Sequence, residues 1–305
     1  MTVLQLKNVY KSFGKLQVIK DLSFSVEDRT VFGFIGKNGA GKTTTMKMIL
    51  GFLQPDGGEI YVCGERVIYG NTSTNRHVGY LPDVPEFYGY MSPMEYLKLC
   101  GEISGLPRET VLARSKELLS LVGLEGINRR IRGFSRGMKQ RLGIAQALLN
   151  EPKLLICDEP TSALDPIGRK EILDILSVAK QKTTIVFSTH ILSDVERIAD
   201  SIGLIDEGKL MLEGPVHKIK DMKRKDIIKI QLSGTERING LAERLKELPF
   251  VLGVHIENDS IFVNLTGAQE HGGMIMSLLV TENVPVLRYE IQEPSLENVF
   301  LEVVG

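Results

Sequence analysis

Residues 36–43 read Gly-Lys-Asn-Gly-Ala-Gly-Lys-Thr, between an apolar run at 31–35 and a helix-compatible run at 44–50. In this order of strand, glycine-rich turn and helix, the pattern G-x-x-x-x-G-K-[ST] binds phosphate. Gly36, Gly39 and Gly41 are expected to allow backbone torsions that a side chain would forbid. The N–H groups of the loop can then surround phosphate oxygens at the positive end of the following helix.

Two side chains of this loop have predicted roles of their own. Lys42 supplies a point charge for the terminal phosphates, and Thr43 supplies a hydroxyl for Mg²⁺. The alternative is a chance match in a glycine-containing turn, and the strand–loop–helix setting argues against it.

Length and composition suit a soluble globular protein with one large domain and a smaller one, or two moderate domains. The chain has 305 residues, of which 43% are hydrophobic and 25% charged, with a net charge of −1. This balance gives no global electrostatic case for a nucleic-acid partner. No apolar run approaches about 18 residues and the N-terminus lacks a signal pattern, so we expect no membrane span and no secretion. Cys63, Cys100 and Cys157 form no paired motif, which indicates reduced thiols in a cytosolic protein, with Cys157 a small buried hydrophobe.

The order of the predicted elements favours an α/β fold with a mainly parallel sheet. An N-terminal β-subdomain is expected at 3–9, 22–26 and 31–35, with a further β-compatible stretch at 59–63. A helical insertion is expected at about 92–150, beginning at Ser92-Pro93-Met94-Glu95 with Ser92 as N-cap and continuing with a helix at 110–122. Apolar runs at 153–157 and 183–188 then alternate with helical patterns at 167–180 and 191–199.

The composition of the chain changes near His217, so the first domain is expected at 1–220 and a second at 226–305. The charged run at 218–226 is either a solvated linker or a contact with acidic lipid headgroups. Beyond it the expected order is strand, helix, strand, strand, helix, strand and a final helix, at 227–232, 237–248, 251–256, 261–265, 274–281, 286–291 and 296–303. This is a small α+β, ferredoxin-like module. No catalytic constellation is visible in it, which favours a structural or interaction role.

An apolar run at 154–157 ends in two carboxylates, Asp158 and Glu159. A strand with this ending places Asp158 at the carboxyl edge of a parallel sheet, where ligands bind. Asp158 would hold Mg²⁺ through a water molecule and complement Thr43, and Glu159 would serve as general base toward an attacking water. A strand that simply exits into a polar loop is the alternative reading.

The segment at 133–142, Gly-Phe-Ser-Arg-Gly-Met-Lys-Gln-Arg-Leu, resembles the signature motif Leu-Ser-Gly-Gly-Gln of ABC-type ATPases. Ser135 and Gly137 keep the motif, whereas Phe134, Arg136 and Met138 depart from it. In that family the serine hydroxyl and adjoining N–H groups bind the γ-phosphate of ATP held by the opposite subunit. Read alone, the segment is a helix N-cap at Ser135 followed by a basic amphipathic helix.

Further matches follow in the order of the family. Residues 162–165, Ser-Ala-Leu-Asp, resemble the D-loop, which crosses the dimer interface. Residues 188–190, Ser-Thr-His, resemble the H-loop, whose histidine, here His190, contacts the γ-phosphate. Phe13 occupies the position of the aromatic ring that stacks on adenine, with Tyr10 as a rival. The Mg²⁺-binding glutamine of the Q-loop is replaced by Asp83, which is shorter and charged.

The resemblance implies a P-loop NTPase core of ABC type that binds ATP and Mg²⁺. The implied metal contacts are Thr43, Asp83 and Asp158, and the implied catalytic residues are Glu159 and His190. The implied nucleotide contacts are Phe13, Gly36, Lys37, Asn38, Gly39, Ala40, Gly41, Lys42, Thr43, Thr44, Ser135 and Gly137.

The resemblance also implies partners. The subunit would form a head-to-tail dimer with itself or a related ATPase, and would lie in the cytoplasm against the inner face of the membrane through an integral-membrane partner. The segment at 293–300 resembles the ending of ATPase subunits of bacterial drug and antimicrobial-peptide exporters. A soluble ABC protein acting on ribosomes or DNA, and a P-loop kinase or GTPase, are the alternatives. The cargo, and import versus export, stay open.

Overall fold

The computed structural model describes residues 1–71, 73–222, 226–234, 237–292 and 295–304. The chain divides into two compact units, Met1–Val216 and His217–Gly305. The sequence instead placed the first domain at 1–220 and the second at 226–305. Residues 223–225 of the charged run and residues 293–294 of the exporter-like ending lie outside the described part of the chain.

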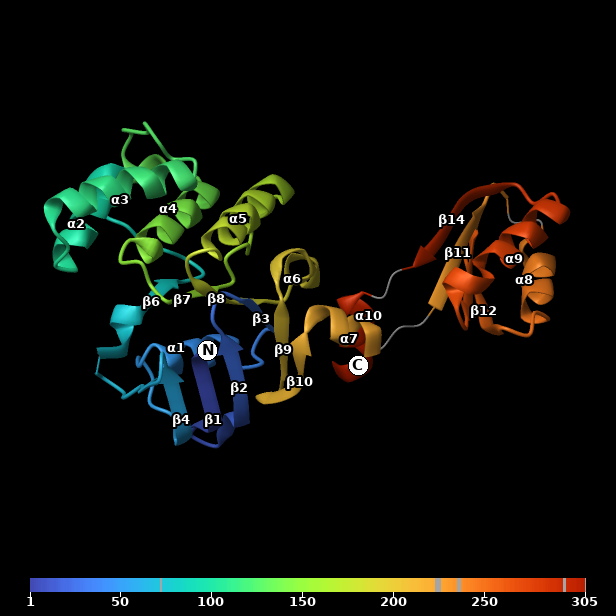
Figure 1. Cartoon of the computed structure of the whole chain (residues 1–305), viewed down its shortest axis with the longest axis horizontal. Helices are drawn as coiled ribbons and strands as arrows, with labels where there is room; N and C mark the ends of the chain where they lie inside the picture. Colours follow the sequence, from blue (N-terminus) through green and yellow to red (C-terminus); the bar gives the residue numbers. More distant parts are fainter. Residues whose placement is uncertain (72, 223–225, 235–236, 293–294, 305) are drawn as a thin grey trace. The chain divides into compact units, whose positions relative to one another are not determined.

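A six-stranded sheet forms the centre of the first unit (Figure 1), in the order β10-β9-β3-β8-β7-β6. Every pair of neighbours is parallel except β10–β9, which forms an antiparallel hairpin at one edge. The strands are β3 (Val31–Ile35), β6 (Val78–Leu81), β7 (Leu154–Asp158), β8 (Thr184–Thr189), β9 (Ser201–Asp206) and β10 (Lys209–Pro215). All residues of β3, β7 and β8 are buried, as expected of parallel strands covered on both faces. The predicted mainly parallel sheet is confirmed.

A second, antiparallel sheet is formed mostly by the N-terminal segment, in the order β2-β1-β4-β5. Its strands are β1 (Thr2–Phe13), β2 (Leu16–Glu27), β4 (Gly57–Val62) and β5 (Glu65–Arg66). The predicted N-terminal β-subdomain is therefore confirmed, with strands that run further than the apolar residues alone indicated. The extra residues form a long hairpin in which Phe13 pairs with Leu16, so strand pairing extends them beyond the buried part.

Helices cover the parallel sheet. Figure 1 shows α2 to α5 on one side of it, and α1 with the antiparallel sheet on the other. The helices are α1 (Lys42–Ile49), α2 (Pro93–Ile103), α3 (Arg108–Leu121), α4 (Arg136–Leu148), α5 (Pro166–Ala179) and α6 (Leu192–Ile198), with short 3₁₀ turns at Ser73–His77 and Ile131–Gly133. The predicted start of α2 is confirmed: Ser92 and Glu95 form a reciprocal capping box, and Pro93 occupies the first turn.

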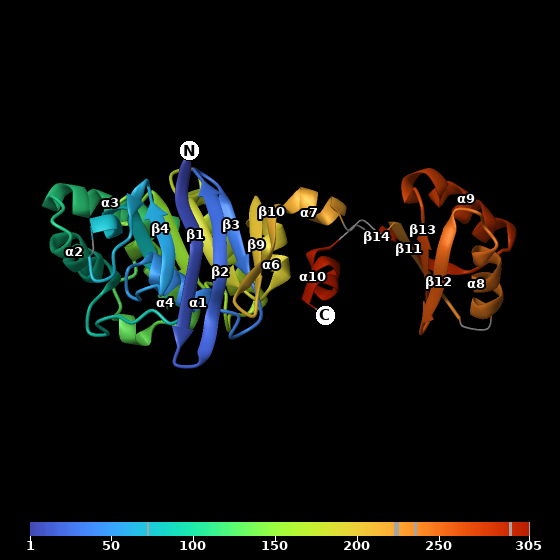
Figure 2. The same cartoon turned by 90° about the horizontal axis from the view of Figure 1, so that it is seen from below.

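The second unit contains a four-stranded antiparallel sheet in the order β12-β13-β11-β14 (Figure 2). Its strands are β11 (Asp226–Leu232), β12 (Val251–Glu257), β13 (Ser260–Leu265) and β14 (Val286–Gln292), and its helices are α7 (Val216–Met222), α8 (Ile238–Lys246), α9 (Ala268–Thr281) and α10 (Leu296–Val304). The inward side chains of β11 and β13 form one core with α8 and α9. The predicted βαββαβ order of a ferredoxin-like module is confirmed.

The structure differs from the sequence-based prediction in several elements. Strand β6 and the β9–β10 hairpin were not predicted, and α9 begins at Ala268 instead of Met274. The predicted helix began only after Gly272 and Gly273, because each glycine weakens a helix by about 1 kcal/mol. Burial of Ala268 and Ile275 against the sheet of the second unit offsets that cost. Among the described residues, no helix combines the length and the apolar character needed to span a bilayer.

Helix α4 packs unusually close to strand β6, because two glycines leave room for it. A Cβ at Gly79 of β6 would lie 2.2 Å from the carbonyl oxygen of Ala147 in α4. A Cβ at Gly143 of α4 would lie 2.5 Å from the Leu81 side chain of β6. The backbones of α4 and β6 are therefore held in one fixed relation.

We expect Gly79→Ala to lower the free energy of unfolding by about 1–3 kcal/mol, the cost of overpacking a close contact. The obstacle is a main-chain atom, which cannot rotate away as a side chain could. Denaturant unfolding of the full chain measures the effect. Gly133→Ala is the matched control, since a Cβ there meets nothing within 4 Å. Equal stability of the two variants would contradict the fixed relation between α4 and β6.

Candidate functional site

The loop from β3 to α1 contains the predicted phosphate-binding glycines. Gly39 and Gly41 have φ angles of 83° and 110°, which favour glycine over residues with a side chain. The prediction that Gly36 also supplies such a torsion is wrong, because its φ is not positive. Glycine is required there for space: a Cβ at Gly36 would lie 2.5 Å from the carbonyl oxygen of Ile205 in β9.

A cavity of about 350 Å³ opens at this loop. It brings together most of the predicted loop residues with two carboxylates from elsewhere in the chain. Its lining residues are Asn38, Gly39, Gly41, Lys42, Thr43, Thr44, Asp83 and Glu159. Lys37 and Ala40 belong to the same loop but do not line the cavity; Ala40 is buried, and its N–H donates to the Lys37 carbonyl. The cavity lies at the N-terminus of α1, where the helix dipole favours an anion.

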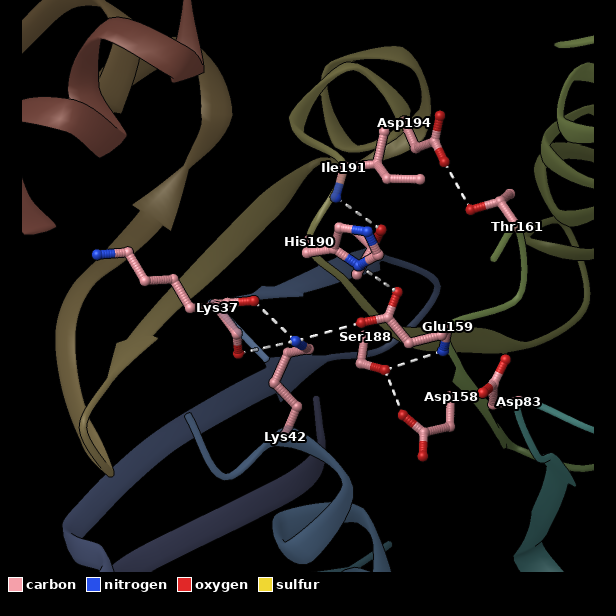
Figure 3. A network of polar contacts seen from close by, with 12 residues as sticks. Lys37, Lys42, Asp83, Asp158, Glu159, Thr161, Ser188, His190, Ile191 and Asp194 are labelled. Carbon is pink, nitrogen blue, oxygen red and sulfur yellow. Dashed lines mark hydrogen bonds and ion pairs between the residues drawn. The ribbon is translucent and has the colours of Figure 1, made fainter. Parts of the chain in front are cut away.

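Lys42 is the buried cation of this cavity, with only 6% of its side chain exposed. Its Nζ donates hydrogen bonds to the carbonyl oxygens of Gly36, at 2.7 Å, and Lys37, at 3.2 Å. The same Nζ lies 3.2 Å from Oε1 of Glu159 (Figure 3). A phosphate that bound to Lys42 would therefore compete with the Glu159 carboxylate for this ammonium group.

Asp158, the last residue of strand β7, and Glu159, which follows it, both contact the serine hydroxyl of β8. Ser188 donates to Oδ1 of Asp158 at 2.6 Å and accepts from the N–H of Glu159 at 3.0 Å. Asp158 is 3% exposed, so this hydroxyl is a major partner of a buried carboxylate. Ser188 was not among the residues predicted from the sequence to take part in the site. The sequence signal that could have found it is a hydroxyl side chain directly after the apolar residues 185–187.

Glu159 is held in a strained conformation with its side chain between Lys42 and His190. Its φ is 47°, which is uncommon for a residue other than glycine and often marks a functional site. Nδ1 of His190, the first residue after β8, lies 3.0 Å from Oε2 of Glu159. Oε1 is buried and accepts no hydrogen bond of good geometry, although Lys42 is near. One carboxylate oxygen of Glu159 thus contacts His190, and the other lies within ion-pair distance of Lys42.

Asp83 follows β6 and lines the cavity, but its side chain is held by α4. Its Oδ1 forms an ion pair with Nη2 of Arg136 at 3.1 Å, and its carbonyl oxygen accepts from Nε2 of Gln140 at 2.7 Å. Neither Arg136 nor Gln140 was predicted to take part in the site. Arg136 was noted only as a departure from the signature pattern, and no sequence signal paired it with Asp83.

Besides Gly36, Lys37 and Ala40 of the loop itself, three predicted nucleotide contacts from elsewhere in the chain do not line this cavity: Phe13, Ser135 and Gly137. The Ser135 hydroxyl caps α4 and accepts from the N–H of Met138 at 3.3 Å. Phe13 lies at the end of the β1–β2 hairpin with its ring half exposed, and Lys11 stacks on it. Its rival Tyr10 is also outside the cavity lining. Within one chain, therefore, only part of the predicted set is assembled.

The donors at the cavity fit a Mg²⁺ ion held mostly by a nucleotide. Within the described residues, no cluster of three or more His, Cys, Asp or Glu side chains could hold a metal alone. The cavity does offer the Thr43 hydroxyl and the Asp83 carboxylate, and Asp158 lies next to Glu159. Magnesium usually binds through one or two such groups, with phosphate oxygens and water completing its six ligands.

Two family models match parts of the chain. Residues 19–162 match the family model described as ABC transporter, and residues 214–304 match that of the C-terminal domain of DrrA1-3-like ATP-binding proteins. The chain is 37% identical over 303 residues to the uncharacterized ABC transporter ATP-binding protein YxlF of Bacillus subtilis, covering 99% of both. It is 36% identical to the bacitracin transport ATP-binding protein BcrA of Bacillus licheniformis, covering 100% of this chain and 98% of the relative.

A third relative is the linearmycin resistance ATP-binding protein LnrL of Bacillus subtilis, 32% identical with 99% and 98% of the two chains covered. Among solved structures, the ATP-binding subunit of an ABC transporter is 33% identical, with a TM-score of 0.65, and covers 72% of this chain and 92% of that one. CbiO1 from Clostridium perfringens, part of a transporter complex, is 26% identical with a TM-score of 0.67, covering 73% and 92%.

We expect Ser188→Ala to cost about 1–3 kcal/mol of folding stability, because it removes a hydrogen bond from the buried carboxylate of Asp158. The free energy of unfolding measures this loss. Ser177→Ala is the matched control, since its hydroxyl donates only to Leu173 within the same helix. That change should stay within about 0.5 kcal/mol of the wild type. If both variants lost the same stability, Ser188 would not be a specific support of the site.

Proposed function

Since the chain belongs to the family of ABC transporter ATP-binding proteins, we propose that it hydrolyses ATP at the cavity of Lys42 and Glu159 to drive export through a separate membrane chain. The family hydrolyses ATP to power transport. The observation that carries the assignment of the site is the meeting of Lys42, Glu159 and His190 at one glycine-rich cavity.

The glycine loop and Lys42 bind the phosphates of ATP. The loop offers backbone N–H groups at the start of α1, and Lys42 exchanges its contact with Glu159 for phosphate oxygens. Thr43, Asp83 and Asp158 would hold Mg²⁺, directly or through water, and the ion would supply positive charge against the phosphates. Phe13 is the aromatic group for the adenine, because its ring is exposed at a hairpin end.

Glu159 acts as general base in the hydrolysis. Its contact with His190 fixes Oε2, which leaves Oε1 as the acceptor for a proton of the attacking water. The water oxygen forms a bond to the γ-phosphorus, and the bond to the bridging oxygen breaks, leaving ADP and inorganic phosphate. Because Lys42 releases Glu159 when phosphate binds, the base becomes free when the substrate arrives.

A second protomer completes the site. Ser135 and Gly137 lie at the N-terminus of α4 and do not line the cavity of their own chain. They therefore serve the γ-phosphate held by another subunit in a head-to-tail dimer, either a second copy or a related ATPase. Residues 162–165 lie at the crossing between the subunits, where Asp165 caps α5.

A groove beside α4, which we call the partner groove, suits the membrane chain as a binding surface. It has a volume of about 440 Å³. Its apolar wall contains Val84, Pro85, Phe87 and Ile131, and its charged residues are Asp83, Glu86, Arg132, Arg136 and Lys139. Tyr88 and Tyr90, on the same loop, are largely exposed. In this proposal the groove binds an amphipathic segment of the partner, which holds the subunit in the cytoplasm at the inner face of the membrane.

The transported compound belongs to the class of drugs or antimicrobial peptides. Two relatives that match over nearly their whole length carry the names bacitracin transport and linearmycin resistance. The match at residues 214–304 to the C-terminal domain of DrrA1-3-like proteins supports the same subfamily.

We expect Glu159→Gln to reduce steady-state ATP hydrolysis at least about 100-fold, the contribution of a general base, while ATP binding persists or tightens. Binding is retained because the change weakens the ionic competitor of the phosphates at Lys42. Fluorescence titration with an ATP analogue and a phosphate-release assay measure the two quantities. Lys42→Ala provides the contrast, since it should lose ATP affinity itself. Substantial turnover by Glu159→Gln, or unchanged binding by Lys42→Ala, would refute the assigned site.

We expect Ser135→Arg to cripple hydrolysis without weakening ATP binding by an isolated subunit. The reason is that Ser135 serves the nucleotide of the other protomer. An equal mixture with Lys42→Ala should restore part of the activity, because some dimers then contain one composite site with both motifs intact. A loss of monomer affinity as large as that of Lys42→Ala would disprove the head-to-tail arrangement.

A further inference from the structure

Asp83 lies on the boundary between two cavities of the first unit. It lines the cavity at the glycine loop and also the partner groove. Its side chain is 45% exposed, so the carboxylate is not locked by burial. A single side chain is thus available to both cavities.

Helix α4 holds Asp83 at two points one helical turn apart. Gln140, which is fully buried, donates to the carbonyl oxygen of Asp83 at 2.7 Å. Arg136 pairs with the carboxylate at 3.1 Å. Residues four apart lie on the same face of a helix, so both contacts come from the surface of α4 that faces β6.

The two contacts differ in how easily they break. Gln140 fixes the backbone, and the close packing of Gly79 and Gly143 fixes β6 against α4. The ion pair, by contrast, joins two partly exposed side chains, of which Arg136 is 41% exposed. Such pairs contribute little, equivalent to about a 1.5- to fivefold factor in an equilibrium. The carboxylate can therefore change partner while the backbone of Asp83 stays in place.

A change of partner alters the charge of the groove. Arg136 and Asp83 both line it, together with the cations Arg132 and Lys139 and the carboxylate of Glu86. While the pair is formed, Asp83 neutralises Arg136. When the carboxylate turns to the other cavity, Arg136 keeps its charge without that partner. The groove then becomes more positive and favours an acidic partner segment.

We propose that Arg136 is a positioning residue for Asp83, and that Mg²⁺–nucleotide competes with Arg136 for the Asp83 carboxylate. Binding in one cavity thereby uncovers a cation in the other. This inference rests on the proposed function, because it takes ATP and Mg²⁺ as the ligands of the first cavity. Arg136 departs from the signature motif, and Asp83 replaces the glutamine of the Q-loop. These two departures thereby act together, because Arg136 positions Asp83.

The test compares nucleotide affinities of the full chain, with Mg²⁺ and with EDTA, by fluorescence titration of an ATP analogue. We expect Arg136→Gln to increase the ratio of the two affinities about two- to fivefold, because the carboxylate no longer has a competing partner. Arg136→Lys should keep the ratio of the wild type. In the Asp83→Asn background, Arg136→Gln should have no further effect.

Arg130→Gln is the matched control. Arg130 forms an exposed ion pair of the same length, 3.1 Å, with Glu95, and neither residue lines either cavity. The ratio of nucleotide affinities with Mg²⁺ and with EDTA should be the same in Arg130→Gln as in the wild type. An unchanged ratio in Arg136→Gln, an equal effect in EDTA, or additivity with Asp83→Asn would overturn the inference. Those results leave the proposed function intact, whereas a wild type that fails to bind the nucleotide would refute the function itself.

Discussion

The register of three parallel strands determines the rest of the site. Strand β8 pairs with β3 so that Ile35 lies opposite Thr189, and with β7 so that Asp158 lies opposite Ser188. All three strands therefore end at the same edge of the sheet. The residues that follow, Gly36, Glu159 and His190, meet there although they are far apart in the sequence. A parallel sheet collects such chain ends at one edge, and its buried faces fix the register.

At this edge the opposite charges of Lys42 and Glu159 compensate each other, and a bound phosphate must replace one partner of that pair. Lys42 and Glu159 are both largely buried, with 6% and 13% of their side chains exposed, and their charged groups lie 3.2 Å apart. Burial of either charge without a partner would be costly. ATP exchanges one pairing for another, since its phosphates take the ammonium and leave the carboxylate for water. The site is thus arranged for exchange of partners, and Asp83 with Arg136 repeats that arrangement at its border.

Much of the fold and of the site could be predicted, because the signals were local. The glycine loop, the capping box at Ser92 and the strand that ends in Asp158 each depend on residues a few positions apart. The role of Gly36 was mispredicted, because the constraint is the carbonyl oxygen of Ile205, far away in sequence. The β9–β10 hairpin and the early start of α9 were missed for the same reason: pairing and burial, not local propensity, stabilise them.

The sequence by itself determined the chemistry: which residues can cradle phosphate, accept a proton or bind a metal, since these properties belong to residue types in a short pattern. Only the tertiary structure decided which of them share one cavity. It separated Ser135 and Gly137 from the loop of their own chain, and it joined Asp83 to Arg136. The physical reason is that contacts between distant segments depend on sheet register and on the close approach of α4 to β6, which no local pattern encodes.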